Sequence, residues 1–81
     1  MTLTDSAITK SIDARGMACP GPLLALIGAI RAGQVGELYE VISSDPGSRT
    51  DIPAWVAKAK HEVVRIVEET GFVRFIVRKV R

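Results

Sequence analysis

The chain has 81 residues, of which 47% are hydrophobic and 25% are charged, with a formal net charge of +2 and one cysteine, Cys19. This length fits one domain, 1–81, because domains typically have roughly 50 to 250 residues. So small a domain has little room for an internal ligand cavity, and one cysteine excludes an internal disulfide and every multi-cysteine metal or haem signature. We therefore expect its chemistry at the surface.

The single thiol also bears on the compartment. Cys19 must stay reduced or react with an external group, which favours the cytoplasm. The uncharged stretch 16–30 resembles the core of a secretion signal, but it contains Pro20 and Pro22, and cleavage behind it would leave about 50 residues. It is also shorter than the roughly 20 apolar residues of a membrane span. We expect a cytoplasmic chain that does not contact membranes.

The first half of the chain predicts a strand, a helix and a second strand. Residues 1–6 are polar and are expected to fray, and 8–13 alternates weakly as a strand does. A loop over 15–22 then leads into a helix over 23–32, with Gly33 in the left-handed position just past its end. Cys19 thus falls at, or one residue before, the start of this helix. A buried strand follows over 37–43.

The second helix is predicted from one apolar face, which consists of Ile52, Val56, Ala59 and Val63. Two starts fit its sequence. With Thr50 as N-cap, Pro53 falls in the first turn, where its missing amide is harmless. With Ser48 as N-cap, Asp51 completes a capping box, but Pro53 then stands where an amide is needed.

The C-terminal part predicts a hairpin, with strands over 64–69 and 72–80 joined by a Thr70-Gly71 turn. The element order is therefore β-α-β-α-β-β. We expect an α/β two-layer sandwich in which both helices cover one face of the sheet and the other face stays open.

No cofactor or metal motif is present. His61-Glu62 begins like a zinc-protease pattern, but Arg65 stands where the second histidine must be. No dinucleotide fingerprint or phosphate-binding loop occurs. Nothing in the sequence brings His61 to Cys19, so we interpret His61 as a helix-end residue.

Cys19 is the strongest chemical candidate. A lone cytosolic cysteine is more often a small buried hydrophobe, but a thiol before a helix faces unpaired amides and the positive end of the helix dipole, which stabilise a thiolate. Because Pro20 and Pro22 lack N–H groups, the donors left for an anion are Gly21 and Leu23. Without a second cysteine no internal dithiol cycle can form, which favours a nucleophile that accepts a group, such as a persulfide sulfur, and releases it to another molecule.

Segment 13–22, with the sequence DARGMACPGP, resembles the signature of the TusA/SirA family of small sulfur-carrier proteins. Four further segments, 44–46, 50–55, 61–62 and 74–79, resemble family landmarks in the family's order. The resemblance covers essentially residues 8–80. It implies a two-layer sandwich with a mixed four-stranded sheet.

The resemblance also implies a function. Cys19 matches the cysteine that carries persulfide sulfur, which makes the chain a sulfurtransferase if transpersulfidation is counted as enzymatic. Family members accept sulfur from cysteine desulfurases or rhodaneses and pass it to relay proteins such as the DsrE-like group. Their sulfur serves tRNA thiolation, molybdenum-cofactor assembly or sulfur trafficking. Gly16 belongs to the matching persulfide loop, and Asp45 and Asp51 match acidic positions expected to influence partner docking.

Two departures from the family pattern stand out. Gly21 replaces a position that often holds a larger or acidic residue, which leaves the loop less shielded. The helix over 23–32 has no charge before Arg31, whereas relatives often place basic residues on its exposed side. Either its outer face consists of small residues, namely Ala25, Gly28 and Ala29, or Leu24 forms an apolar docking patch for a partner or for a weak homodimer.

The C-terminal strand is the one candidate nucleic-acid feature. Arg74 and Arg78 share strand parity and could line the open face, but solvated charges on an edge strand explain them equally well. Trp55 and Phe75 are interpreted as packing residues. We do not expect direct nucleic-acid binding, and a regulatory or RNA-binding module with a structural Cys19 is the alternative to a sulfur carrier.

Overall fold

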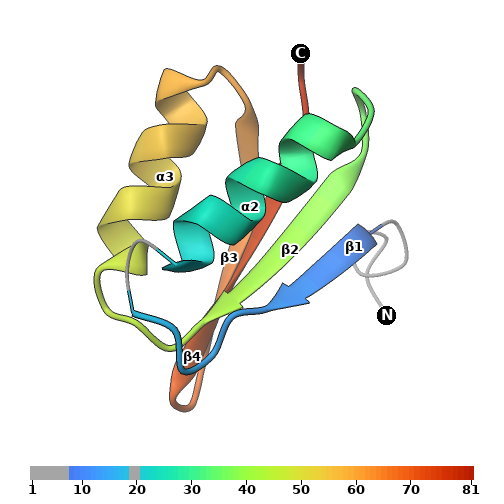
Figure 1. Cartoon of the computed structure of the whole chain (residues 1–81). Helices are drawn as coiled ribbons and strands as arrows, with labels where there is room; N and C mark the ends of the chain where they lie inside the picture. The colour runs from blue at the N-terminus through green and yellow to red at the C-terminus, as the bar shows by residue number, and fades with distance from the viewer. Residues whose placement is uncertain (1–7, 19–20) are drawn as a thin grey trace.

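The computed structural model describes residues 8–18 and 21–81. Its elements follow the predicted order, β-α-β-α-β-β (Figure 1). They are β1 Ile8–Asp13, α2 Gly21–Ala32, β2 Leu38–Ser43, α3 Ser48–Lys58, β3 Glu62–Glu69 and β4 Phe72–Arg78. Two predictions lie outside the described residues, namely the fraying of 1–6 and the placement of Cys19 and Pro20 at the helix start.

The four strands form one mixed sheet with the order β1-β2-β4-β3. β1 pairs with β2 in parallel, and β4 pairs antiparallel with both β2 and β3. Helices α2 and α3 lie on the same face of this sheet, and the opposite face carries no helix of the described chain (Figure 1). The predicted two-layer α/β sandwich is confirmed.

The core lies between the helices and the central strands. Alternate residues of β4, including Phe75, point to the helices, because successive side chains of a strand face opposite sides of the sheet. The fully buried side chains of this cluster come from both helices and the two central strands: Leu26, Val41, Ile52, Phe75 and Val77. Trp55 is partly buried against the cluster, so the interpretation of Trp55 and Phe75 as packing residues is confirmed.

Gly33 ends α2 for a different reason from the one predicted. The residues with a positive φ do not include Gly33, so the left-handed cap is wrong. A Cβ at this position would lie 1.4 Å from the hydroxyl oxygen of Tyr39, which packs directly against the backbone here. The last turn of α2 is instead closed by Lys79, whose Nζ donates to the carbonyls of Ile30 at 2.7 Å and Gly33 at 3.0 Å.

Neither predicted start of α3 is correct. The helix begins at Ser48 with Gly47 as its N-cap, and no side chain caps it. The Ser48 hydroxyl is buried and shares a hydrogen bond of 2.8 Å with the Ser43 hydroxyl on β2. This hydroxyl, which could have capped the helix, is therefore engaged in a tertiary contact instead. Pro53 then falls inside the helix, and the carbonyl one turn earlier loses its amide donor.

The end of α3 also differs from the predicted pattern. Lys60 adopts a left-handed conformation, with φ of 65°, and the amides of Lys60 and His61 bond back to Ala57 and Val56, as in a Schellman cap. Val63, predicted on the helix face, therefore lies in β3 and packs against the core from the sheet. The interpretation of His61 as a helix-end residue is confirmed.

The C-terminal hairpin is confirmed. A two-residue Thr70-Gly71 turn joins β3 and β4, and Gly71 has φ of 84°, which the turn requires and which glycine adopts without strain. β3 starts two residues earlier than predicted, at Glu62, and β4 ends two residues earlier, at Arg78.

Candidate functional site

The loop that precedes Cys19 is held at the edge of the sheet where β1 and β2 end. Because β1 and β2 are parallel, their carboxyl ends meet at this edge, and the loops that follow them come together. The Ala14 amide donates to the Ile42 carbonyl at 2.8 Å, and the Gly16 amide donates to the Ser44 hydroxyl at 3.0 Å. Gly16 has φ of 87°, a conformation that other residues rarely adopt.

Arg15 fixes the same loop to the end of β1. Its guanidinium binds both carboxylate oxygens of Asp13, at 2.9 and 2.8 Å, and its amide donates to that carboxylate at 3.1 Å. The hydrogen bonds from Arg15 lower the pKa of Asp13 to about 2. The guanidinium also lies 5.2 Å from the centre of the Phe72 ring at the hairpin turn, within the range of a cation–π contact.

The residues just before α2 pack closely. The Gly21 amide donates to the Ala18 carbonyl at 2.8 Å, so it already has a partner and is not left open for an anion as expected. A Cβ at Gly21 would lie 3.1 Å from the Cβ of Met17, so a larger residue here would crowd the loop. Met17 itself is 47% exposed and adds apolar surface beside the start of α2.

The first turn of α2 separates buried from exposed residues. Pro22 is fully buried, Leu23 packs against the core, and Leu24 is 60% exposed, so Leu24 points outward as hypothesised. Of the small residues expected on the outer face, Gly28 is exposed, but Ala29 is buried in the core, which corrects that part of the expectation.

The two acidic candidates lie on the loop after β2 and on α3. Asp51 stands in the first turn of α3. Asp45 lines a hollow of about 370 Å³ together with Ser44, Arg49 and Phe72, and its Oδ2 is buried without a hydrogen-bond partner in the described chain. Ser44 bonds to Gly16, so the loop that carries Asp45 contacts the loop that leads to Cys19.

Two contacts of this site are not foreseeable from local sequence patterns. The Ser44–Gly16 hydrogen bond follows from the parallel pairing of β1 and β2. The only sequence feature that indicates this pairing is the β-α-β order of the elements. The Arg15–Phe72 contact joins positions 57 residues apart, and no pattern in the sequence points to it.

His61 lies in the connection between α3 and β3, and this end of α3 is at the opposite end of the molecule from these loops (Figure 1). Its Nδ1 accepts a hydrogen bond from the Val80 amide at 3.1 Å, and its ring centre lies 5.8 Å from that of Trp55. Within residues 8–18 and 21–81, no three His, Cys, Asp or Glu side chains are grouped as a metal site, and no helix has the length and apolarity to cross a membrane.

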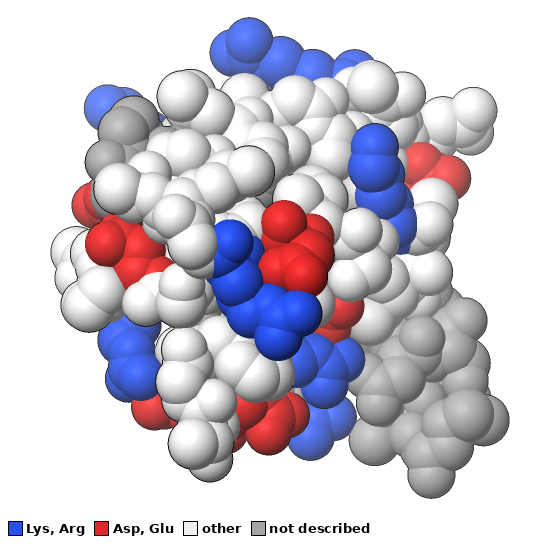
Figure 2. All heavy atoms as spheres, turned by 60° about the horizontal axis from the view of Figure 1, so that its bottom comes forward, with Lys and Arg blue, Asp and Glu red and all other residues white. Residues whose placement is uncertain are grey.

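The basic residues of β4 are neutralised by acids. Arg74 and Arg78 share the open face, as predicted, but β4 lies between β2 and β3, so the interpretation as edge-strand charges is wrong. Arg74 Nε donates to Glu40 at 2.5 Å, and Arg78 pairs with Glu62. In the view of Figure 2, basic and acidic side chains are interspersed, and a broad uncharged area lies beside them. This view shows no continuous basic patch of the kind that binds nucleic acid.

Comparison with known proteins gives consistent matches over nearly the whole chain. Residues 10–79 match the family model described as Sulfurtransferase TusA. A relative from Archaeoglobus fulgidus is 47% identical over 70 residues, which cover 86% of this chain and 96% of the relative. The Sulfur carrier protein TusA of Pseudomonas aeruginosa is 38% identical over 73 residues, which cover 90% of this chain and 92% of that protein.

A solved structure shares the fold. The crystal structure of a SirA-like protein from Desulfitobacterium hafniense superposes with a TM-score of 0.79 at 19% identity, covering 90% of this chain and all of that one. The mixed four-stranded sheet with two helices on one face is therefore shared with that protein.

Proposed function

The chain belongs to the TusA family of sulfur carriers, and we propose that it carries its sulfur as a persulfide on Cys19. The observation that supports this most is the family match over residues 10–79, which includes the chain's single cysteine two positions before the start of α2. A cysteine desulfurase or rhodanese supplies the sulfur, and a DsrE-like or other relay protein receives it. Because the thiol must stay reduced between cycles, we place the relay in the cytoplasm.

Transfer takes place in two thiol exchange steps. The Cys19 thiolate attacks the terminal sulfur of the donor's persulfide, the donor's S–S bond breaks, and its electron pair leaves with the donor's cysteine as a thiolate. An acceptor thiolate then attacks the terminal sulfur on Cys19 and releases the Cys19 thiolate. The sulfur moves without an external oxidant or reductant, and in this sense the chain acts as a sulfurtransferase.

The surroundings of Cys19 support an anionic sulfur. Helix α2 runs for 12 residues from Gly21, and its N-terminus carries the partial positive charge of the helix dipole. The Gly21 amide is already bonded to Ala18, so we assign the donor role to the Leu23 amide. Pro20 and Pro22 restrict the backbone of the turn, and Gly16 allows the loop to approach Ser44.

Partner docking is proposed at the exposed apolar residue of the first helical turn. Leu24 is 60% exposed, and no charged residue precedes Arg31 on this helix, so docking by Leu24 depends on apolar burial rather than on basic residues of α2. Asp45 lies on the loop that contacts Gly16, and Asp51 lies in the first turn of α3 that follows this loop. Both provide acidic groups that a sulfur donor or acceptor protein can bind. The end product is tRNA thiolation, molybdenum-cofactor assembly or sulfur trafficking.

The proposal is tested by transfer of labelled sulfur from a cysteine desulfurase through this chain to an acceptor. Cys19→Ala should abolish transfer, because no other thiol is present. Leu24→Lys should leave folding intact and reduce transfer about tenfold, as expected if roughly 1.4 kcal/mol of apolar contact is lost.

Val35→Lys is the matched control, because Val35 is an equally exposed apolar residue, at 64%, just beyond the other end of α2. This variant should transfer sulfur at the normal rate. Transfer that persists in Cys19→Ala contradicts the carrier role, and equal rates for the Leu24 and Val35 variants contradict docking through Leu24.

A further inference from the structure

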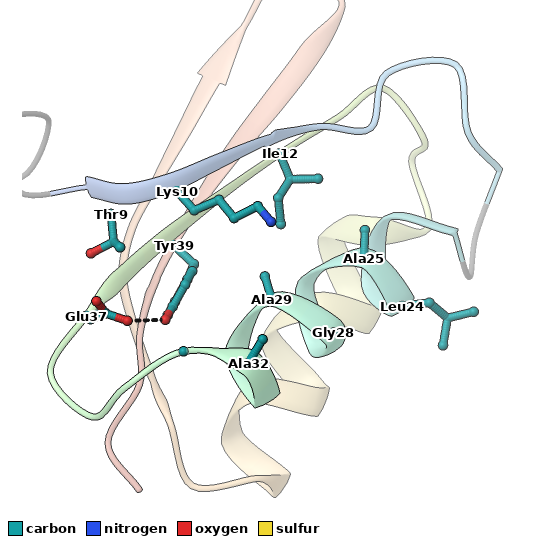
Figure 3. Close-up of a pocket in the computed structure, with 11 residues that line it drawn as sticks. Thr9, Lys10, Ile12, Leu24, Ala25, Gly28, Ala29, Ala32, Glu37 and Tyr39 are labelled. Atoms are coloured by element: carbon teal, nitrogen blue, oxygen red, sulfur yellow. Dashed lines mark hydrogen bonds between the residues drawn. The ribbon is translucent and has the colours of Figure 1, made fainter.

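A groove of about 570 Å³ runs between β1 and α2 on the helix-covered side of the sheet (Figure 3). It exists because α2 packs mainly over β2, and β1, at the border of the sheet, extends beyond it. The strand side of the groove is formed by Thr9, Lys10 and Ile12, with Tyr39 and Glu37 at one end. The outward-pointing Leu24 lies at the other end.

The helix side of the groove consists of residues with little or no side chain. Four of them line it in succession: Ala25, Gly28, Ala29 and Ala32. A Cβ added at Gly28 would meet nothing within 4 Å, so the groove is open space at its middle. Apolar side chains of a bound segment could fill this space without displacing any residue.

Lys10 gives the groove an uncompensated positive charge. Its side chain reaches from β1 along the groove toward Ile12, and its ammonium has neither an ion pair nor a hydrogen bond with the described chain (Figure 3). Glu37, the acidic residue of the groove, is already engaged, because it accepts hydrogen bonds from the Tyr39 hydroxyl at 2.6 Å and from the Gln34 amide at 2.8 Å. The charge of the groove therefore favours a bound carboxylate at Lys10.

The backbone of β1 offers a second means of binding. β1 pairs with β2 on one side, and no described strand pairs with its other side. In a parallel pair, every second residue of an edge strand directs its N–H and C=O groups away from its neighbour, where another extended chain can bind them.

We propose that this groove binds an extended segment of a partner protein as an added strand beside β1, with a carboxylate against Lys10 and an apolar side chain two positions away against Ile12 and Gly28. The two-residue spacing follows from the alternation of side chains in a strand, since Lys10 and Ile12 share the helix side of β1. The partner is a member of the sulfur relay, so this inference rests on the proposed function. Leu24 ends the groove in the first turn of α2, next to the segment that carries Cys19.

A second copy of this chain does not fit the groove in the same way. If two β1 strands joined around a twofold axis perpendicular to the sheet, the helix sides of both strands would coincide. Lys10 would then face Lys10 or Ile12 of the copy, and neither is acidic. The acidic residue of β1, Asp13, lies on the other face and is bound by Arg15. The charge of the groove therefore favours a different protein.

The test uses two synthetic peptides with capped ends, Thr-Leu-Thr-Glu-Thr-Leu-Thr and the same peptide with Lys in place of Glu. Each is titrated into the full isotope-labelled chain and followed by amide NMR shifts. The Glu peptide should shift the amides of 8–13 and 25–32, and should bind at least fivefold more tightly than the Lys peptide, consistent with about 1 kcal/mol from one charge pair. Lys10→Glu should reverse this preference.

Gly28→Leu should abolish binding of both peptides, because its side chain fills the groove while improving the helix propensity of α2. Ala54→Leu, at an exposed position of α3, is the matched control and should bind normally. Equal shifts with both peptides, an unaltered preference in Lys10→Glu, or no shifts in β1 would overturn the groove proposal.

The same samples separate this proposal from the carrier function. Inorganic polysulfide can load Cys19 without a partner protein, so loading should be equal in the chain and in its Gly28→Leu and Lys10→Glu variants. If the unsubstituted chain is loaded normally but does not bind the Glu peptide, the groove proposal alone is contradicted. A chain that binds the Glu peptide but cannot be loaded contradicts the carrier function alone.

Discussion

At the scale of single residues, the requirement for glycine at position 33 comes from a close side-chain contact and not from the left-handed backbone conformation that usually follows a helix. Glycine after a helix usually indicates a left-handed cap, but Gly33 is present because the Tyr39 hydroxyl lies against its backbone. That hydroxyl donates to Glu37 at 2.6 Å, and Tyr39 is almost fully buried in the core. The aromatic ring therefore has little freedom to move away from an added methyl group.

Gly33→Ala should lower the free energy of unfolding by about 1 to 3 kcal/mol, the usual cost of overpacking a core. Urea unfolding followed by circular dichroism measures this change. Gly28→Ala is the control, because the space around Gly28 is open, and it should raise stability by roughly 0.5 to 1 kcal/mol. An alanine at position 33 that leaves stability unchanged would contradict the packing described.

The residues of the candidate site were predictable to different degrees. The exposure of Leu24 was one of two alternatives, because α2 has no charged residue before Arg31 to mark its outer side, and the structure shows Leu24 to be 60% exposed. The hydrogen bond from the Gly21 amide to the Ala18 carbonyl could not be predicted, because it depends on the path of the loop and not on residue type. Likewise, Arg15 reaches Phe72 through the fold of the hairpin.

At the scale of elements, α3 illustrates why helix ends are hard to predict. Ile52, Val56, Ala59 and Val63 have helical spacing, but Val63 reaches the same core from a strand, and periodicity cannot distinguish the two. The helix ends where Lys60 turns left-handed, a conformation in which glycine is the usual residue. The apolar spacing thus predicted which side of α3 is buried, and not where the helix stops.

Lys60→Gly should raise the free energy of unfolding by about 0.5 to 1 kcal/mol. The left-handed conformation costs a residue with a Cβ about 1 to 2 kcal/mol, and part of the gain is offset because glycine has more freedom in the unfolded chain. Thermal and urea unfolding measure the change. Lys58→Gly, within the helix, should instead lower stability by about 1 kcal/mol, and a loss of stability in Lys60→Gly would be inconsistent with the observed cap.

Strand order is the other property of the elements that local patterns did not reveal. Alternation predicted that Arg74 and Arg78 share a face, and they do. Their place on a central strand depends on the pairing of β4 with β2, which joins residues 30 to 40 positions apart in the chain. The same pairing brings Arg74 to Glu40, which is only 5% exposed.

At the scale of the whole molecule, His61 connects three parts of the fold. It follows α3, precedes β3, and accepts a hydrogen bond from Val80 beyond β4. Burial, together with the positive charges of Lys79 and Arg81, lowers the pKa of His61 below its ordinary value of 6.5. The unfolded chain therefore binds a proton more readily at this position than the folded chain does.

Stability should consequently be highest above pH 6.5 and should fall as the pH drops from 6.5 toward the lower pKa of the folded state. Urea midpoints measured at intervals between about pH 7.5 and pH 5 would detect this loss. His61→Gln removes the titrating group, so its stability should vary less over this interval. An identical slope for the chain and the variant would show that another group is responsible.

The whole molecule also positions the features proposed for sulfur transfer. The parallel pairing of β1 and β2 brings the loop before Cys19 to the loop of Asp45. α2 begins two positions after Cys19, and Leu24 is exposed in its first turn. His61 and the C-terminus are at the other end. The proposed docking residue Leu24 and the described segments that flank Cys19 therefore lie at the same end of the fold, and the sequence has no second cysteine.

The most direct test of the account is the intact mass of the chain after incubation with a cysteine desulfurase and cysteine. If Cys19 carries persulfide sulfur, the chain should gain one sulfur atom that a reductant removes, that maps to Cys19, and that is absent in Cys19→Ala. A chain that keeps its unmodified mass under conditions that load another TusA-family protein would contradict it.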